Sequence, residues 1–520
     1  MSFSLARVRT FFSAPLAEEP GRLRLWLCLG TFAWLVVWSR YWPYTGDGDS
    51  MLHYWNLRVT WLDPKLGLTS WARPLYVLLM IVPAQFGWLA ARTFAAFVTT
   101  LLVWQTMRMA DDLELRNANL AGLFLIFQPL AFALASDTMT EIPMALGLVI
   151  ALRLWWAKRF AASCLLMSFL PLARPEGFLL APVWGLFLLA LPRTKEHPTW
   201  PQRFLIGSSL ATGIVTLLVV CRIVAGQWLY FVYEWSWPLV GTQKGSLWHH
   251  VIYWPYYCGW ILLPLFLLGL LPSLRRRMGL AWAAWATVLV AHSYMFWTGT
   301  FGALGFMRIL VSTAPVTALI CLYGWNGLAF VLRAERWPAL LRRALTAVVI
   351  FAAALTVMIY YVAEPMHYRF VLAQKAAAFV RANQLLTSAP RLFAADQSVF
   401  VELKIPPREV LLVVHDPKKP PFETGLLVRN YFTREESVSQ FQALPANTVG
   451  VWDNDQGRWW HHVQPEEFPG LGYQLLYKVR QTEKEFLPNF PAWMKEYLLD
   501  PFIALKYGGP EQEFVVVRKQ

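Results

Sequence analysis

Charged residues are scarce in this sequence. Asp, Glu, Lys and Arg make up 15% of its 520 residues, whereas hydrophobic residues make up 57%. A soluble domain has about a quarter charged residues, so the composition excludes a water-soluble globular protein as the class of the whole chain. Most of the sequence must face lipid or other buried segments.

Among the charged residues the acidic ones are scarcer, with 32 acidic against 46 basic residues, which gives a formal net charge of +14. This excess does not indicate a nucleic-acid partner, because the arginines lie in short stretches between apolar runs, as the positive-inside rule requires. Tryptophans at the ends of these runs suit anchors at the lipid headgroups; they include Trp38, Trp42, Trp71, Trp155, Trp156, Trp254 and Trp297. The expected partner is a lipid bilayer.

Cysteine is also rare, with five residues, none of them after Cys321. The sequence has no CxxC or Cys/His ligand spacing, which argues against disulfides and structural zinc. A cleavable signal is missing too, because the basic N-terminus leads into an apolar run without a small-residue cleavage site. We expect a retained first helix that starts in the cytoplasm. Internal repeats and low-complexity tracts are absent.

Apolar runs of roughly 20 residues predict membrane spans. About eleven are found, at about 25–42, 91–109, 118–135, 142–157, 161–173, 177–192, 204–225, 257–272, 279–297, 309–332 and 344–362. Basic clusters then alternate so that they fall on the N-terminal side of the membrane. An odd number of spans leaves the C-terminal region on the opposite side.

The segment Pro74 to Gly87 is apolar but short, and it contains Pro83. We interpret it as an interfacial or re-entrant helix within a long first outer loop, about 43–90. The topology depends on this interpretation, because a full span here would place later acidic residues on the other side from Asp47 and Asp49.

Beyond residue 364 charges become frequent and short β-like runs alternate with helix-like stretches. The runs are 392–395, 410–415, 449–453, 473–478 and 514–517, and the helix-like stretches include 367–386 and 433–444. We predict two domains, a transmembrane module at 1–363 and a soluble α/β domain at 364–520 on the outer side.

The first candidate site follows the first span directly. In Tyr44-Thr45-Gly46-Asp47-Gly48-Asp49-Ser50, two carboxylates lie one residue apart in a glycine-loosened turn. Such a pair accepts a proton from a hydroxyl or holds a divalent cation. The pattern alone is weakly specific, and its position at a membrane face is what makes Asp47 and Asp49 candidates.

Further ionisable residues collect in the predicted outer loops, where charge at membrane depth usually marks a site. They are His53, Asp137, Glu141, Arg174, Glu176, Lys244 and Arg308. Structural alternatives stay open for several. Asp137 and Glu141 suit a helix cap, Arg174 and Glu176 a mutual ion pair, and Arg308 a side chain that snorkels to the headgroups. We expect His249 and His250 to be interfacial.

Several of these motifs resemble the GT-C superfamily of integral membrane glycosyltransferases. Residues 44–49 resemble the Tyr-Thr-Asp-x-Asp type sequence of lipid-linked mannosyltransferases, with Gly46 inserted. Arg73-Pro74-Leu75-Tyr76, Phe86-Gly87 and Ala91-Arg92 resemble a pattern of the aminoarabinose and protein-mannosyl branch. Residues 137–143 resemble the second acidic motif of that branch.

The resemblance implies an α-helical polytopic membrane enzyme with an extracytoplasmic domain. It would move a sugar, with a mannose-like hexose favoured, from a polyprenyl-phosphate donor to a glycan, lipid or protein acceptor with inversion. Asp49 or Asp47 would be the base, and Arg308, Arg174 or Lys244 would stabilise the leaving phosphate. Asp137 and Glu141 would bind acceptor hydroxyls or a metal.

Some relatives need Mg²⁺ or Mn²⁺ and others need neither, so a metal at Asp47 and Asp49 stays open. The expected location is a bacterial inner membrane, with the active face in the periplasm. Two other classes remain. A transporter or flippase would show mid-span charges and often inverted repeats. A structural subunit would tolerate the loss of the Asp49 carboxylate.

Overall fold

The computed structural model describes residues 20–41, 48–69, 72–233, 244–274, 276–300, 305–333, 336–363, 368–389, 392–406, 434–454, 457, 462–482 and 511–520. The chain divides into two compact units, which we describe separately. The helical unit comprises Met1–Tyr41, Arg92–Val215 and Thr242–Tyr360. The mixed unit comprises Trp42–Ala91, Thr216–Gly241 and Tyr361–Gln520.

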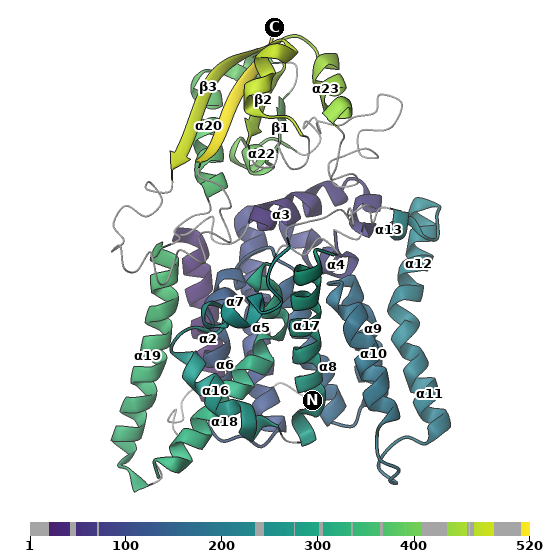
Figure 1. Ribbon diagram of the computed structural model, residues 1–520, viewed down its shortest axis with the longest axis vertical. Helices are drawn as coiled ribbons and strands as arrows, with labels where there is room; N and C mark the ends of the chain where they lie inside the picture. The colour runs from purple at the N-terminus through teal and green to yellow at the C-terminus, as the bar shows by residue number, and fades with distance from the viewer. Residues whose placement is uncertain are drawn as a thin grey trace, which may run out of the picture. The chain divides into compact units, whose positions relative to one another are not determined.

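Long apolar helices form most of the helical unit (Figure 1). They are α2 (Pro20–Tyr41), α5 (Trp88–Asp112), α6 (Asn119–Ile126), α7 (Pro129–Leu134), α8 (Glu141–Trp156), α9 (Phe160–Phe169), α10 (Glu176–Leu189), α11 (Trp200–Ser208), α16 (Leu262–Ser273), α17 (Gly279–Thr298), α18 (Ala314–Val331) and α19 (Ala339–Ala363). Helix α12 (Thr212–Ala225) begins in the helical unit, but most of its residues belong to the mixed unit. Short helices α14 (His249–Ile252) and α15 (Trp254–Cys258) precede α16, and the 3₁₀ segments η2 (Leu170–Leu172) and η5 (Met307–Thr313) precede α10 and α18.

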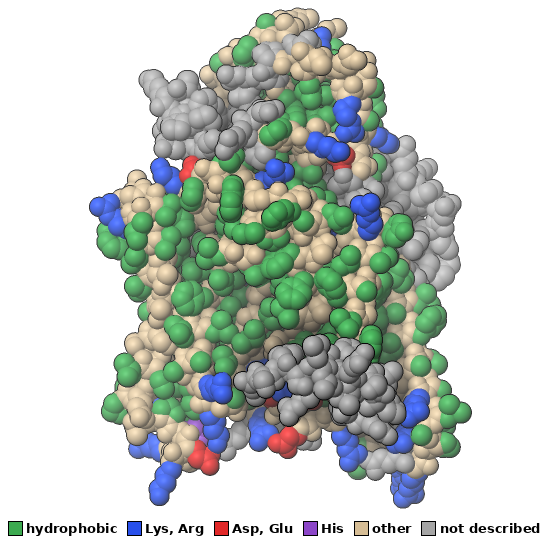
Figure 2. Space-filling model, turned by 180° about the vertical axis from the view of Figure 1, so that it is seen from behind, with side chains coloured by type: hydrophobic (Ala, Val, Ile, Leu, Met, Phe, Trp, Pro, Cys, Tyr) green, Lys and Arg blue, Asp and Glu red, His purple; other side chains and the backbone are tan. Residues whose placement is uncertain are grey.

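Every predicted span contains helix in the structure. Three helical stretches are long and apolar enough to cross a membrane, namely Trp200–Ala225, Met307–Val331 and Ala339–Met358. The first and last of these are mostly exposed, as lipid-facing helices would be, whereas the middle one is enclosed by its neighbours. Figure 2 shows the matching surface, a wide hydrophobic band on the helical unit with Lys and Arg side chains gathered at its lower end.

The predicted span at 118–135 is interrupted. It consists of α6 and α7, and Pro129 begins the second helix. Proline lacks the backbone N–H that a continuous helix would need at this point. The buried Gln128 side chain instead donates to the Phe124 and Ala314 carbonyls, at 3.2 and 2.9 Å, and so ties the break to α18.

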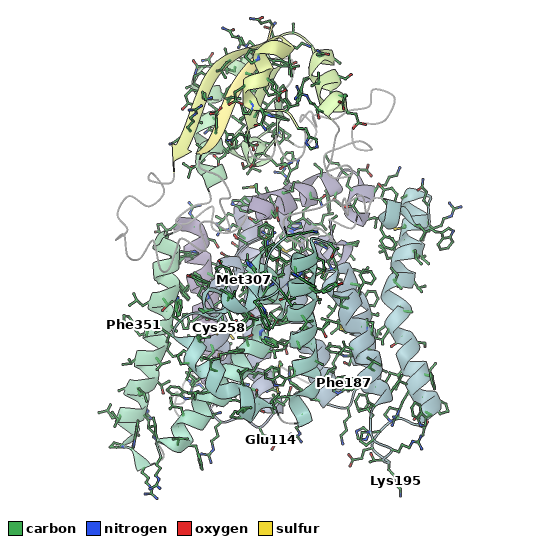
Figure 3. All side chains as sticks on the ribbon, viewed as in Figure 1. Glu114, Phe187, Lys195, Cys258, Met307 and Phe351 are labelled. Carbon is green, nitrogen blue, oxygen red and sulfur yellow. The ribbon has the colours of Figure 1, made fainter. Side chains whose placement is uncertain are left out.

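One end of the helical unit is held together by bonds between the loops that carry the basic clusters. Arg277 lies 2.9 Å from Glu114, and Trp156 donates to the Arg277 carbonyl at 2.7 Å. Lys158 pairs with Glu196. Figure 3 shows Glu114 and Lys195 at this same end. The clusters that the positive-inside rule predicts on one side therefore share one end of the unit.

The mixed unit joins the first outer loop to the C-terminal part of the chain. Its elements are α3 (Gly48–Thr60), η1 (Pro64–Leu68), α4 (Pro74–Gln85), α13 (Tyr230–Tyr233), α20 (Tyr368–Ala382), α21 (Leu385–Ser388), β1 (Leu392–Ala394), α22 (Ser398–Glu402), α23 (Arg434–Ala443), β2 (Val449–Asp453), η7 (Pro465–Leu471), β3 (Tyr473–Thr482) and β4 (Glu511–Lys519). The apolar segment after Arg73 is the short helix α4, with Pro83 inside it.

The four strands form one sheet in the order β1-β2-β4-β3. Strands β1 and β2 are parallel, and the other pairs are antiparallel. Four of the five predicted β runs are strands, and the fifth, 410–415, lies outside the described residues. The sheet has a buried core on each face, because alternate residues of β1, β2 and β4 enter different cores.

The first of these cores includes Leu392, Ala394, Val449, Val451 and Val516, and the second includes Phe393, Ala395, Trp452, Val515 and Val517. The four-stranded sheet with helices in the same region confirms the predicted C-terminal α/β fold. The predicted domain boundary at 363/364 stays a prediction.

Candidate functional site

Charged side chains meet inside the helical unit where α8 and α10 begin. Glu141 and Glu176 are the first residues of these two helices, and Arg174 precedes α10 by two residues. All three residues are buried. Unpaired charges in such surroundings would be strongly destabilising, so their pairing determines what this group can do.

Arg174 lies between the two glutamates and pairs with both. Its Nη1 is 2.6 Å from Glu141 Oε1, and its Nη2 is 2.8 Å from Glu176 Oε1. The same guanidinium donates to Thr140 Oγ1 at 2.9 Å. Thr140 occupies the N-cap of α8, yet its side chain makes no capping bond. The Glu141 carboxylate, in the first turn of α8, pairs with Arg174, and the mutual ion pair of Arg174 and Glu176 is present.

Arg308, from η5, approaches Glu141 less closely. Its Nε is 3.7 Å from Glu141 Oε1, and its guanidinium lies over the Phe306 ring at 4.6 Å from the centroid. The Arg308 side chain is 13% exposed, against 8% for Arg174. Two arginines and two glutamates balance in charge. Of the two arginines, Arg308 is the more exposed and has the longer contact with Glu141.

Asp137 belongs to a neighbouring buried pair. Arg92 of α5 has its Nε 3.5 Å from Asp137 Oδ1 and donates to the Ser136 and Ser39 carbonyls at 3.0 and 3.1 Å. These bonds join α2, α5 and the segment before α8. We refer to Glu141, Arg174, Glu176 and Arg308, with the Arg92–Asp137 pair, as the ionic cluster. Met307, beside Arg308, lies toward the end of the helical unit opposite Glu114 and Lys195 (Figure 3).

Two histidines extend the ionic cluster, and neither was identified as a site residue from the sequence. His292 Nε2 lies 3.1 Å from Glu176 Oε1, and the next side chain, Ser293, contacts His250 Nδ1 at 3.2 Å. Burial lowers the pKa of His250 to about 3, with a smaller contribution from the neighbouring His249. His250 is therefore buried, and its surroundings favour the neutral ring, while its predicted interfacial position stays a prediction. A histidine inside the apolar run 279–297 was the available signal for His292.

The predicted catalytic loop belongs to the mixed unit. Asp49 is half-buried in the first turn of α3, where the helix dipole stabilises a carboxylate. His53 is buried one turn later, with its ring edge-on to Tyr76 at 5.4 Å between centroids. Asp47 lies outside the described residues.

The described residues add no support for a metal site at Asp47 and Asp49 or for a phosphate contact at Lys244. Within the described ranges, no three His, Cys, Asp or Glu side chains lie close enough together to hold a metal ion. Lys244 is exposed and forms no hydrogen bond or ion pair with any described residue. Both assignments stay predictions.

No protein-family model matches the chain, and no curated protein matches its sequence. Solved structures match its fold. The crystal structure of ArnT from Cupriavidus metallidurans in the apo state aligns with a TM-score of 0.56 at 14% identity, over 87% of this chain and 96% of that one. The chain has the fold of ArnT. ArnT bound to undecaprenyl phosphate aligns with a TM-score of 0.59 at 16% identity, over 88% of this chain and 95% of ArnT.

The ArnT fold confirms the class predicted from the sequence, namely a mostly helical protein with several apolar helices and a small C-terminal mixed sheet. It also confirms the predicted resemblance at the level of the fold, over both units of the chain.

Proposed function

We propose that this protein is a membrane glycosyltransferase that takes a sugar from a polyprenyl-phosphate donor. The observation that carries the proposal is the ArnT fold over 88% of the chain, because one of the matching ArnT structures holds undecaprenyl phosphate. The predicted setting is a bacterial inner membrane with transfer on the periplasmic face. A mannose-like hexose stays the favoured sugar, and the acceptor is a glycan, lipid or protein hydroxyl or amine.

Asp49 is the proposed base. A carboxylate that accepts the acceptor's proton while the acceptor attacks the anomeric carbon gives inversion in one step, and the sugar–phosphate bond breaks in the same step. The half-buried position of Asp49 in the first turn of α3 is compatible with this role. Asp47, two residues earlier, stays the alternative base, and the two carboxylates together remain the candidate site for a divalent cation.

Arg308 is the proposed cation for the leaving phosphate, whose negative charge grows as the bond breaks. It is preferred over Arg174, which two glutamates already neutralise. Glu141 keeps Arg308 in place until an anionic ligand competes for it. We assign Arg174 and Glu176 to positioning Glu141, and Asp137 and Glu141 to acceptor hydroxyls.

The charge distribution disfavours the transporter class. The buried ionic groups sit at the starts of α8 and α10 rather than at mid-span, where transporters hold their ions. An activity assay distinguishes a structural subunit from an enzyme, because only an enzyme transfers sugar and depends on the Asp49 carboxylate.

The test measures transfer of label from a panel of polyprenyl-phosphate sugars to a membrane acceptor by purified wild type and Asp49→Asn. We expect transfer by the wild type from at least one donor, and a loss of about 100-fold or more in the variant, since general base catalysis contributes about 10²–10⁴-fold.

Asp63→Asn is the matched control for that assay, because Asp63 caps η1 in the same loop by accepting from the Lys65 N–H and Asn caps equally well. Full activity in Asp49→Asn and in Asp47→Asn would exclude both as the base. No transfer from any donor by folded wild type would overturn the glycosyltransferase assignment.

A further inference from the structure

We propose that the C-terminal fold positions the catalytic carboxylate, because α22, which shares a hydrophobic core with one face of the sheet, packs on α3. The inference rests on the proposed function, because it takes Asp49 as the base. It gives the C-terminal part of the chain a specific role in the reaction, that of holding the helix that carries the base.

Residues of the first outer loop lie inside the hydrophobic core of the C-terminal sheet. Trp55 and Val59 of α3 and Leu66 of η1 are fully buried members of the same core cluster as Leu392, Val451 and Val516 of the sheet. The ring centroids of Trp55 and Phe400 of α22 are 5.4 Å apart. We call this cluster the α3-facing core. Segments more than three hundred residues apart in the sequence therefore share one core.

The spacing of the contacts shows that a whole face of α3 is engaged. Leu52, Trp55 and Val59 are three and four residues apart, so they lie on one side of the helix, and all three pack in the α3-facing core. Other residues bind α3 to α4 and the start of α5. Gln85 donates to the Leu57 carbonyl at 3.2 Å, and the ring centroids of Tyr54 and Trp88 are 5.1 Å apart.

Asp49 lies on the same rigid element. At 1.5 Å per residue it is about 9 Å along the helix axis from Trp55, so a shift of the helix at Trp55 is transmitted to the carboxylate. Misplacement of a reacting group by about 1 Å can slow a reaction about 100-fold. The α3-facing core thus determines where the base can sit.

The opposite face of the sheet offers a matched control. Its core contains Phe393, Phe441, Trp452, Phe468 and Tyr473, and no described residue of α3 or η1 belongs to it. Phe400 and Phe441 are both fully buried phenylalanines of the C-terminal region. Replacing either one leaves a cavity of similar size in the same domain, but only Phe400 touches the α3 side chains.

The experiment compares Phe400→Ala, Phe400→Leu and Phe441→Ala in the full-length protein in detergent. Hydrogen exchange of residues 48–60 reports the order of α3, and kcat and the donor KM report catalysis. We expect Phe400→Ala to speed exchange in α3 and lower kcat about 10- to 100-fold with little change in donor KM. Phe400→Leu should restore most of kcat, and Phe441→Ala should change neither exchange in α3 nor kcat.

Equal losses of kcat in Phe400→Ala and Phe441→Ala would overturn the proposal, since a general need for a folded domain would then explain both. Unchanged exchange in α3 in Phe400→Ala would also overturn it. The exchange measurement needs no substrate, so a failure of the proposed function, seen as an inactive wild type, is distinguishable from a failure of this inference.

Discussion

At the scale of single residues, charge balance separates the arginines of the ionic cluster. Arg174 is within 2.8 Å of two carboxylates, whereas Arg308 is 3.7 Å from the one that it shares with Arg174. A buried cation that is already matched has little attraction left for a phosphate, and removing it would leave uncompensated negative charge. Replacement of Arg308 and of Arg174 should therefore have different effects, the first on donor binding and the second on stability.

Replacement of Arg308 should weaken donor binding. We expect Arg308→Ala to raise the donor KM by about 10-fold or more, because a charge-assisted bond contributes about 1.5–3 kcal/mol. The acceptor KM should change much less. Steady-state kinetics with each substrate varied in turn checks this, with the exposed Arg333→Ala as control. Equal increases in the two KM values would contradict a phosphate role.

Replacement of Arg174 should damage stability. Arg174→Met leaves Glu141 and Glu176 facing a single arginine, and we expect a loss of about 3–5 kcal/mol. The double variant Arg174→Met/Glu176→Gln restores charge balance, so it should unfold at a higher temperature than Arg174→Met. Thermal unfolding of the purified variants in detergent provides the measurement, and simple additivity of the two substitutions would contradict the coupling.

At the scale of elements, α22 ends in a carboxyl group, that of Glu402, whose protonation changes the stability of the C-terminal fold. Burial raises the pKa of Glu402, at its end, to about 7, and the charge of Lys404 opposes this by a smaller amount. Between the ordinary glutamate pKa of about 4.3 and about 7, the folded state binds more protons than the unfolded chain. The free energy of unfolding therefore falls as the pH rises through this window.

Glu402→Gln should remove that dependence. We expect hydrogen exchange in residues 392–406, corrected for the intrinsic rate, to show decreasing protection from pH 5 to 8 in the wild type, across the window set by the raised pKa. The variant should show a smaller change. Glu435→Gln, at an exposed position of α23, serves as control. An unchanged pH dependence in Glu402→Gln would exclude this carboxyl as its source.

At the scale of the whole molecule, the two units differ in the surroundings that they suit, lipid for the helical unit and water for the sheet of the mixed unit. Apolar helices of the helical unit present a hydrophobic surface, and basic side chains gather at one of its ends (Figure 2). The mixed unit has a sheet with a buried core on each face. The odd number of predicted spans leads us to predict that the C-terminal region lies on the side of the membrane opposite the basic loops.

Cysteine labelling in sealed inside-out vesicles tests this topology. The five native cysteines are buried, so introduced thiols report alone. We expect Lys195→Cys, in an exposed loop of the basic end, to react with a membrane-impermeant reagent. Gly470→Cys, where an added Cβ meets nothing within 4 Å, should react only after the vesicles are opened. Labelling of both in sealed vesicles would contradict the predicted number of crossings.

The sequence by itself was sufficient for the class of the protein and the positions of its elements. Scarce charge and long apolar runs leave few alternatives to a bundle of membrane helices, because a buried backbone must satisfy its own hydrogen bonds. Alternation of apolar residues located strands such as 449–453 to the residue. The break at Pro129 was not predicted, because the search for long apolar runs ignored this proline, although proline geometry is a local rule that would have located it.

Only the tertiary structure decided which charges meet. Glu141, Arg174, Glu176 and Arg308 are spread over more than 160 residues, and no local pattern specifies that Arg174 bridges Glu141 and Glu176 or that Arg308 lies 3.7 Å from Glu141. The apolar run 279–297 marked His292 as unusual, but its partner Glu176 is 116 residues away, so the sequence did not specify their contact. The burial of Trp55 against Phe400 likewise depends on long-range packing, which is non-directional and leaves no spacing signal in the sequence.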